Sequence, residues 1–202
     1  MPASPPAASY GRTPVPVVVL VEPALHHEAE FLAAVTRSHR LHGRWVTPPG
    51  TAEQFRRFVS RLSEPSHRGH LVFTQDGDLV GVVVISEIVR GGFQSGYLGY
   101  YAFAPWAGLG CMRAALDQVI SLAFGAYALH RLEANIQPEN LRSRALIESL
   151  GFRCEGYSPR YLKIRGRWRD HERWALTAEE WRRPARLSAR QVPPARREGR
   201  AG

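Results

Sequence analysis

A glycine-rich turn between an apolar strand and an amphipathic helix constrains this chain more than any other feature of its sequence. The turn runs from Trp106 to Cys111 and contains Gly108 and Gly110. The residues after it repeat with the 3.6-residue period of a helix that buries one face. The apolar positions of this helix are Met112, Ala115, Leu116, Val119, Ile120, Ala123 and Phe124.

A turn of this kind is suited to an anion. Glycine lets the backbone come close to a ligand, and the free N–H groups at the start of a helix favour negative charge. We therefore expect a diphosphate at the turn, with a tight turn that binds nothing as the alternative. A Walker loop is excluded because no Gly-Lys-Ser/Thr follows, and the third glycine and the acidic partner of a dinucleotide fold are missing.

Further motifs flank the turn along the chain. In order, they are Leu98-Gly99-Tyr100, Gly108-x-Gly110, His130-Arg131, Pro138-x-Asn140-x-x-Ser143, Leu150-Gly151-Phe152, Glu155-Gly156 and Trp168-x-Asp170-His171. Together they resemble the GNAT acyltransferases, and most closely the branch that acetylates N-terminal amines of ribosomal proteins, the ribosomal-protein-alanine N-acetyltransferases. The resemblance covers roughly residues 15–181.

The apolar periodicity also predicts the order of the elements. Strands are expected at 15–21, 71–74, 79–89, 97–103, 131–137, 152–158, 161–165 and 169–177, and helices at 23–39, 51–62, 107–124 and 139–150. This order favours an α/β fold with a mixed sheet. The resemblance implies the GNAT acyl-CoA N-acyltransferase fold, an α/β (α+β) arrangement in which about four helices flank a mixed, mostly antiparallel seven-stranded sheet.

The length of 202 residues favours one domain with extensions at both ends. We expect a disordered lead at 1–14, the N-acetyltransferase domain at 15–181 and a basic disordered tail at 182–202. The tail holds seven arginines and one acidic residue, so it supplies most of the net charge of +9. One interpretation is contact with RNA or a ribosome surface through phosphates, and a solvated tail is the alternative.

Several classes of protein are disfavoured. No apolar run reaches the roughly 20 residues that span a bilayer, and no secretory signal is recognisable. The two cysteines are too few for a disulfide scaffold. His39-x-x-His42 and His67-x-x-His70 lack a carboxylate or cysteine at a suitable spacing, so no metal is expected. We expect a cytoplasmic protein without membrane contact, either monomer or homodimer.

The resemblance implies acetyl-CoA as co-substrate. Its diphosphate would bind the backbone of Ala107, Gly108, Leu109, Gly110, Cys111 and Met112. GNAT loops usually read Gln/Arg-x-x-Gly-x-Gly/Ala, whereas this chain has Ala107 at the first position and Met112 at the last. We therefore expect binding through backbone groups without the side-chain contact.

The pantetheine arm of the carrier would lie along the strand before the turn. Its amides would pair with the backbone of Tyr101, Ala102 and Phe103, as in strand addition. The resemblance gives Asn140 a hydrogen bond to the pantetheine or to a bound water. A helix cap is the alternative role for Asn140, and the two roles are compatible.

Acetyl transfer to an amine needs a proton acceptor for the amine and a proton donor for the leaving thiolate. GNAT enzymes often place a tyrosine donor where this chain has Ile147. Ser143 is the substitute that we expect, with a surface hydroxyl as the alternative interpretation and Tyr161 as a second candidate donor.

For the base, the candidates are Glu133 and Glu87. Glu133 alternates with Asn135 on one strand, so both face the same side of the sheet. A carboxylate that merely pairs with an arginine is the alternative for Glu133. An N-terminal amine has a pKa of roughly 7.7–8.0 against about 10.4 for lysine, so an N-terminal acceptor demands less of the base.

The resemblance also places the loop 38–45 beside the entrance for the acceptor. Trp45 and Tyr161 would line a peptide slot there, with Glu87 as a further residue for substrate, although Trp45 in a plain core is equally compatible. The leading hypothesis is acetylation of the N-terminal α-amine of a protein, with a ribosomal protein as first candidate. The alternatives are a small-molecule amine, such as an antibiotic or polyamine, and a non-catalytic relative that binds RNA or ribosomes.

Overall fold

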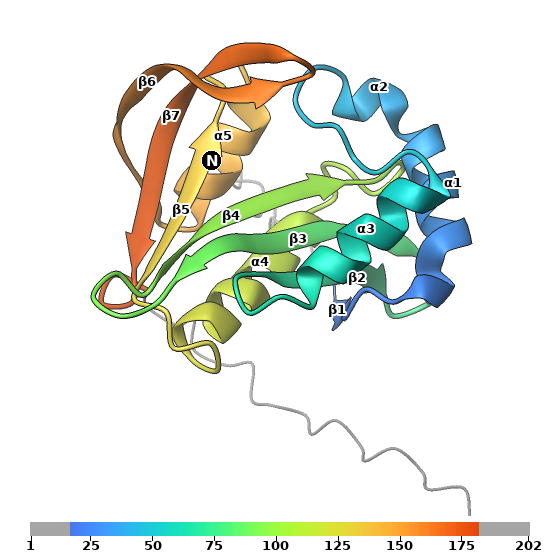
Figure 1. Ribbon diagram of the computed structural model, residues 1–202, viewed down its shortest axis with the longest axis horizontal. Coiled ribbons are helices and arrows are strands. Elements are labelled where there is room, and N and C mark those ends of the chain that lie inside the picture. Colours follow the sequence, from blue (N-terminus) through green and yellow to red (C-terminus); the bar gives the residue numbers. More distant parts are fainter. Residues whose placement is uncertain (1–16, 182–202) are drawn as a thin grey trace, which may run out of the picture.

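The computed structural model describes residues 17–181, so the expected lead at 1–14 and the basic tail at 182–202 lie outside the described residues. The described chain forms one seven-stranded sheet (Figure 1) with the strand order β1-β2-β3-β4-β5-β7-β6. The strands are β1 Val18–Val21, β2 Arg68–Thr74, β3 Leu79–Val89, β4 Ser95–Ala102, β5 Arg131–Ile136, β6 Arg153–Ile164 and β7 Arg167–Thr177. Neighbouring strands are antiparallel except for β4 and β5, which are parallel. This is the mixed sheet that the sequence predicts.

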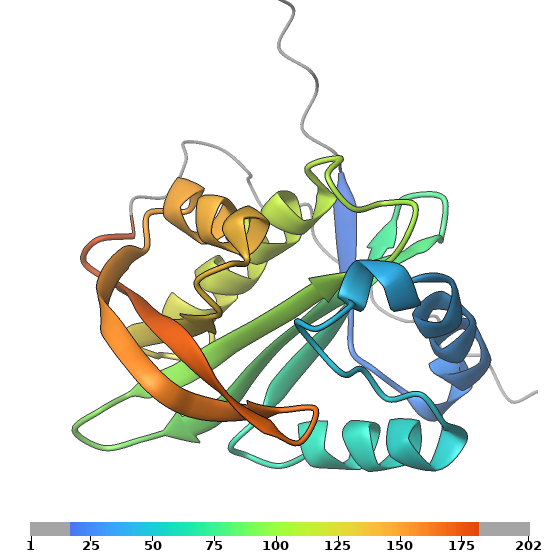
Figure 2. The ribbon, with the colours of Figure 1, turned by 90° about the horizontal axis from the view of Figure 1, so that it is seen from above.

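Helices cover both faces of the sheet (Figure 2). One face carries the 3₁₀ turn η1 Leu25–His27, then α1 Glu28–Arg37, α2 His39–His42 and α3 Ala52–Leu62; the other carries α4 Cys111–Phe124 and α5 Leu141–Ser149. Each layer has its own apolar core. Phe31 and Phe55 pack on the α1–α3 face, and Leu116, Ile120 and Ile147 pack on the α4–α5 face. No helix within residues 17–181 is long and apolar enough to cross a bilayer.

Local signals in the sequence explain several element ends. The Thr51 hydroxyl accepts a hydrogen bond from the Gln54 N–H and caps α3, as expected. At the end of α5, Gly151 adopts φ 90°, its N–H donates to the Glu148 carbonyl, and the Phe152 N–H donates to the Ile147 carbonyl. This is a Schellman motif, which needs a residue that tolerates positive φ. Gly151 therefore ends α5 as predicted.

Some expected boundaries were wrong. The two strands predicted at 152–158 and 161–165 form the single strand β6, because a bulge between Ser158 and Leu162 interrupts the alternation without ending the strand. The helix expected from 107 begins only at Cys111. A helical turn, α2, lies in the segment that the sequence predicts to be a loop.

The strands β4 and β5 separate soon after they meet. They pair only at Ser95–Arg131, Gly96–Leu132 and Tyr97–Glu133, although both strands continue for several residues. Figure 1 shows the two strands diverging from this point. The sheet therefore contains a gap that widens from the Tyr97–Glu133 pair towards the start of α4 and α5. We call it the β4–β5 gap.

Candidate functional site

The glycine-rich turn lies where β4 leads into α4. Gly108 and Gly110 both have positive φ, 84° and 83°, and Gly110 caps α4 without any side-chain hydrogen bond. The first helical hydrogen bond runs from the Ala114 N–H to the Gly110 carbonyl, which leaves the earlier N–H groups of the helix without an intrahelical acceptor. Residues 108–110 are exposed, whereas Cys111 and Met112 are buried in the core. The turn thus presents backbone N–H groups and the positive end of the helix dipole to solvent on a firmly anchored helix.

The edge of β4 that faces the gap can be identified from the hydrogen bonds on its other edge. The Phe103 N–H donates to the Val80 carbonyl at 2.7 Å, so Phe103 is directed towards β3. In an antiparallel pair the direction alternates along the strand, so the peptide groups of Tyr101 also point to β3, and those of Tyr100 and Ala102 point to the gap. The Phe103 carbonyl is engaged as well, because it accepts from the Trp106 N–H.

These bonds revise the expected contacts of the pantetheine arm. Both backbone groups of Phe103 are committed within the protein, so the prediction of a Phe103 contact is corrected. Tyr101 is directed to β3 by the same alternation. Ala102 is directed to the gap, but its carbonyl bonds His42, so only its N–H faces the gap without a partner among residues 17–181. Tyr100 is directed to the gap as well, although no pattern in the sequence signals this role.

Three side chains from the corner between α1 and α2 hold the backbone that precedes the turn. Arg37 Nε donates to the Ala104 carbonyl, the Ala104 N–H donates to Ser38 Oγ, and His42 Nε2 bonds the Ala102 carbonyl, each at 2.9 Å. The loop after α2 and the end of β4 are therefore mechanically linked. We call these three residues the corner clamp.

Ser143 and Asn140 lie together on the α4–α5 face. The Asn140 side-chain oxygen accepts from the Ser143 N–H at 3.3 Å, so Asn140 caps α5, as the alternative interpretation holds. The hydroxyls of Ser143 and Tyr100 are 2.5 Å apart. Burial raises the pKa of Tyr100 to about 12, although the hydrogen bond to Ser143 opposes the shift. Tyr100 therefore stays protonated and supports Ser143 from the strand that borders the gap.

The other expected residues of this region have different surroundings. Ile147, at the position of the usual tyrosine donor, is fully buried in the core and offers no proton. Tyr100 belongs to the Leu98-Gly99-Tyr100 motif, but the sequence gives no signal of its role. Only its contact with Ser143, 43 residues away, marks it as part of the site.

Glu133 and Tyr161 lie on the opposite face of the sheet. Glu133 alternates with the buried residues Leu132 and Ala134 of the α4–α5 core, so it faces the α1–α3 side. Tyr161, from the curled β6–β7 hairpin, hydrogen-bonds Tyr97. Burial raises the pKa of Tyr97, and this hydrogen bond raises it further. Glu133 pairs with Arg131 at 2.9 Å, which is the alternative interpretation of this carboxylate. Arg131 also pairs with Glu155, so Glu133 is held in place at the vertex of the gap.

The remaining predicted residues, Glu87 and Trp45, lie on β3 and in the loop after α2. Glu87 is exposed at a bulge in β3 with φ 48°, and no hydrogen bond within residues 17–181 joins it to Glu133. Trp45 is half-buried, and the Arg44 guanidinium lies 4.5 Å from its ring centroid. The structure thus brings Glu133 and Tyr161 to one side of the gap and Ser143 to the other, and it leaves the Glu87 side chain exposed on β3.

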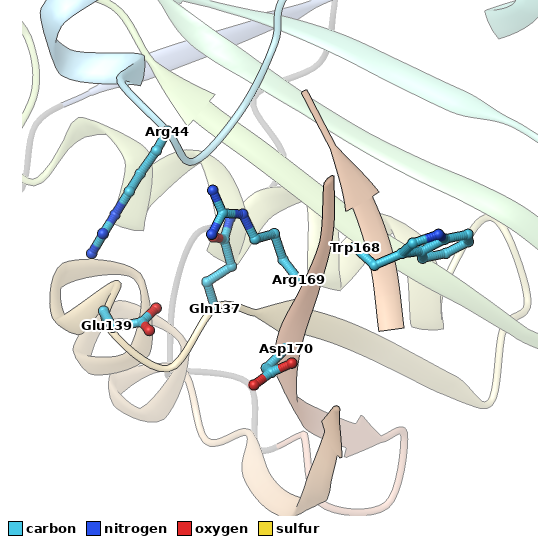
Figure 3. A pocket seen from close by; sticks show the side chains of 6 residues that line it. All are labelled: Arg44, Gln137, Glu139, Trp168, Arg169 and Asp170. Atoms are coloured by element: carbon cyan, nitrogen blue, oxygen red, sulfur yellow. The ribbon is translucent and has the colours of Figure 1, made fainter. Parts of the chain in front are cut away.

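A small cleft of about 130 Å³ lies beyond the end of β5 (Figure 3). Its lining comes from the loop after α2, the segment before α5 and the start of β7, and consists of Arg44, Gln137, Glu139, Trp168, Arg169 and Asp170. In Figure 3, Arg44 extends towards Glu139, and Trp168 points away from both. Asp170 accepts hydrogen bonds from Tyr157 and from the Arg160 N–H, which lower the pKa of its carboxyl. The lining is charged with both signs, so it suits a polar peptide segment.

The histidine pairs of the sequence have separate partners. His42 bonds the Ala102 carbonyl, His67 bonds the Ser66 hydroxyl, and His70 bonds the Tyr127 hydroxyl. Within the described part of the chain, no three histidine, cysteine or carboxylate side chains form a group that could hold a metal ion.

Comparison with known proteins finds relatives of this architecture. Residues 18–153 match the family described as acetyltransferase (GNAT) domain. The chain is 36% identical over 148 residues to the ribosomal protein uS5-alanine N-acetyltransferase of Escherichia coli (strain K12), an alignment that covers 71% of this chain and 72% of that protein.

Two solved structures are similar over most of the chain. The Mycobacterium smegmatis RimJ structure in complex with CoA-disulfide has a TM-score of 0.76 and 30% identity, and the match covers 84% of this chain and 86% of that one. The ribosomal-protein-S5-alanine acetyltransferase of Vibrio fischeri has a TM-score of 0.72 and 26% identity, with coverages of 85% and 97%.

Proposed function

Because this chain belongs to the acetyltransferase (GNAT) family, we propose that it acetylates the N-terminal α-amine of a protein, with a ribosomal protein as the first candidate. The chain is an N-acetyltransferase, and acetyl-CoA is its co-substrate. The acceptor is the proposed part, and the names of the uS5-alanine relatives support it. Such an acceptor implies action in the cytoplasm.

The observation that carries the proposal is that proton-transfer groups border the β4–β5 gap from both faces. Ser143, supported by Tyr100, lies on the α4–α5 side, and Glu133 lies at the vertex on the α1–α3 side. A thioester in the gap would be open to an amine from one side and to a proton donor from the other. This two-sided access suits direct transfer without a covalent enzyme intermediate.

The carrier would bind through the backbone. Its diphosphate would take the N–H groups of Gly108–Met112, where Gly110 caps α4 without a side chain. Its pantetheine amides would pair with the backbone of Tyr100 and with the N–H of Ala102 at the edge of β4, because the Ala102 carbonyl bonds His42. The amide nitrogen of Asn140 would contribute from α5. The arm would thus complete the parted sheet as an added strand does.

The chemistry then needs two proton movements. The neutral amine attacks the thioester carbon, and its nitrogen loses one proton to Glu133, directly or through water, as the new carbon–nitrogen bond forms. As the carbon–sulfur bond breaks, the Ser143 hydroxyl donates to the thiolate. The Tyr100 hydroxyl lies within hydrogen-bond distance of both Ser143 Oγ and the Ser143 carbonyl, so it fixes the position of the serine hydroxyl during this step. The products are the acetylated amine and free CoA thiol.

The acceptor chain would enter through the charged cleft beyond β5. The loop after α2, which carries Trp45, and the β6–β7 hairpin, which carries Tyr161, flank this entrance. An extended N-terminus of a protein fits such an open entrance better than it fits an enclosed chamber.

The test is release of CoA thiol when the protein is incubated with acetyl-CoA and synthetic peptides. N-terminal peptides of ribosomal proteins should react, whereas the same peptides with a blocked N-terminus and a free lysine should react far less. Ser143→Ala should lower kcat by about a hundredfold with little change in the KM for acetyl-CoA. Ser149→Ala, on the exposed side of the same helix, is the matched control. No thiol release with any N-terminal peptide would refute the proposal.

A further inference from the structure

Three buried polar atoms without a partner among residues 17–181 lie on one side of the β4–β5 gap. They are His42 Nδ1, Tyr101 Oη and Asn135 Oδ1. Buried polar atoms in folded proteins almost always have a hydrogen-bond partner, whether protein, water or ligand. The rings of His42 and Tyr101 are in contact and Asn135 lies on the strand across the gap, so these atoms indicate where a polar group entering the gap could bind.

The three side chains come from three elements but face the same layer. Tyr101 of β4 packs against the core of the α1–α3 face, and the His42 ring of α2 meets it edge-on with ring centroids 5.3 Å apart. Asn135 of β5 alternates with Ala134 and Ile136, which belong to the core of the other face. Both strands have separated before these positions, since their last pair is Tyr97–Glu133. The atoms thus flank the gap opposite to Ser143 and the glycine-rich turn.

The chemistry of the three atoms defines what they can bind. His42 Nε2 donates to the Ala102 carbonyl, so Nδ1 carries a lone pair and can only accept. Asn135 Oδ1 is also an acceptor, and a tyrosine hydroxyl can accept or donate. A group with several N–H donors on one small nitrogen matches this set, which is the description of a primary amine.

The charges around the three atoms favour the neutral form of that amine. Burial lowers the pKa of His42, and Arg165 in the β6–β7 turn adds to that shift, so the imidazole stays neutral. Burial also raises the pKa of Tyr101. None of the three side chains is a carboxylate, and the carboxylate of Glu133 on the same face of β5 is already paired with Arg131, so the three atoms themselves offer hydrogen bonds without negative charge. The neutral amine is also the form that attacks a thioester.

We propose that His42, Tyr101 and Asn135 form the seat of the acceptor amine, with His42 Nδ1 and Asn135 Oδ1 accepting its N–H groups. The inference rests on the proposed transfer to a primary amine and assigns the residues that hold it. His42 then has two roles, because its other nitrogen belongs to the corner clamp. The amine would be held on the α1–α3 side with its lone pair directed into the gap.

The two nitrogens of His42 can be separated by substitution. Glutamine can place its amide nitrogen near the position of Nε2, so His42→Gln keeps the donor to Ala102 and loses the acceptor at Nδ1. Asparagine is shorter, so His42→Asn can keep an acceptor near Nδ1 and loses the bond to Ala102. His70→Gln is the control, because His70 is a buried histidine of β2 that bonds Tyr127.

We expect the substitution of His42 by glutamine to weaken binding of the acceptor peptide but not of CoA. In His42→Gln the KM for the acceptor peptide should rise about five- to tenfold, as for one lost hydrogen bond, while the Kd for CoA measured by calorimetry stays unchanged. Asn135→Leu should raise the same KM. His42→Asn should lower the melting temperature more than His42→Gln does and raise the acceptor KM less than His42→Gln does. His70→Gln should leave that KM unchanged.

A second measurement does not depend on turnover. Alaninamide, a minimal N-terminal amine, should bind the wild-type complex with CoA more tightly than it binds the His42→Gln complex. Absence of alaninamide binding to wild type, or equal binding by both folded proteins, would overturn the inference. A wild-type protein that binds alaninamide but acetylates no peptide would instead count against the proposed function alone.

Discussion

Replacing Gly108 by alanine isolates the conformation of the glycine-rich turn from its packing. Gly108 has φ 84°, and a Cβ atom built on it would meet no atom within 4 Å. The substitution therefore adds no clash. It only asks an L-residue to adopt a backbone conformation that costs about 1–2 kcal/mol.

That cost should appear in two quantities. If the turn keeps its shape, the free energy of unfolding falls by about 1–2 kcal/mol, which for a chain of this size lowers the melting temperature by about 2–8 °C. If the turn relaxes instead, CoA binding must restore its original backbone conformation, and the energy this requires weakens binding. The Kd for CoA then rises by up to about tenfold for each 1.4 kcal/mol. In both cases the loss in the free energy of unfolding and the loss in the free energy of CoA binding together cannot exceed the strain at this one residue.

Gly77→Ala provides the matched control. Gly77 also has positive φ, 92°, and open space around its Cβ position, but it lies in the β2–β3 turn. Calorimetric titration with CoA and thermal melting should be run on both variants. Both variants should lose some stability. If the melting temperature of Gly108→Ala falls by less than that of Gly77→Ala, the Kd of Gly108→Ala for CoA should rise, whereas the Kd of Gly77→Ala should not. Equal CoA affinity for both variants, with Gly108→Ala melting like wild type, would refute the argument that this turn holds the carrier.

Two further predictions concern stability. Gly81→Ala should lower the free energy of unfolding by about 1–3 kcal/mol in urea titrations, because its Cβ would lie 2.6 Å from both Met112 Sδ and the Tyr101 carbonyl; an unchanged midpoint would contradict this. Burial lowers the pKa of His42 and His70 below the ordinary value of 6.5 for a histidine, so the unfolded chain binds more protons near that pH. Their contribution to stability should be complete above about pH 6.5 and should fall as the pH drops below it, and a midpoint that rises on acidification would be inconsistent with neutral buried rings.

The turn and the helix ends could be predicted because each depends on a few adjacent residues. Gly108, Gly110 and Gly151 occupy positions with positive φ, which glycine adopts at little cost. Thr51 caps its helix through a bond to an N–H three residues away. The apolar period of α4 likewise identifies its buried face, although not the residue at which the helix begins.

The arrangement of the site could not be predicted in the same way. The separation of β4 and β5 depends on the register of a parallel pair far apart in sequence, and no local pattern reports it. The contact between Tyr100 and Ser143 and the bond from His42 to Ala102 likewise join residues 43 and 60 positions apart. Alternation did place Glu133 and Asn135 on one side of β5, as expected, but it could not say what they would face.

The parting of β4 from β5 also affects how the energy of folding is divided. In an uninterrupted sheet, the peptide groups along these two edges would bond each other as the protein folds. Here the strands form their first three pairs and then leave the rest of the ladder to whatever enters between them. Hydrogen bonds that would otherwise join these two strands are therefore left for a ligand to make. A ligand that completes the ladder would also link the two halves of the sheet and so stabilise the folded state.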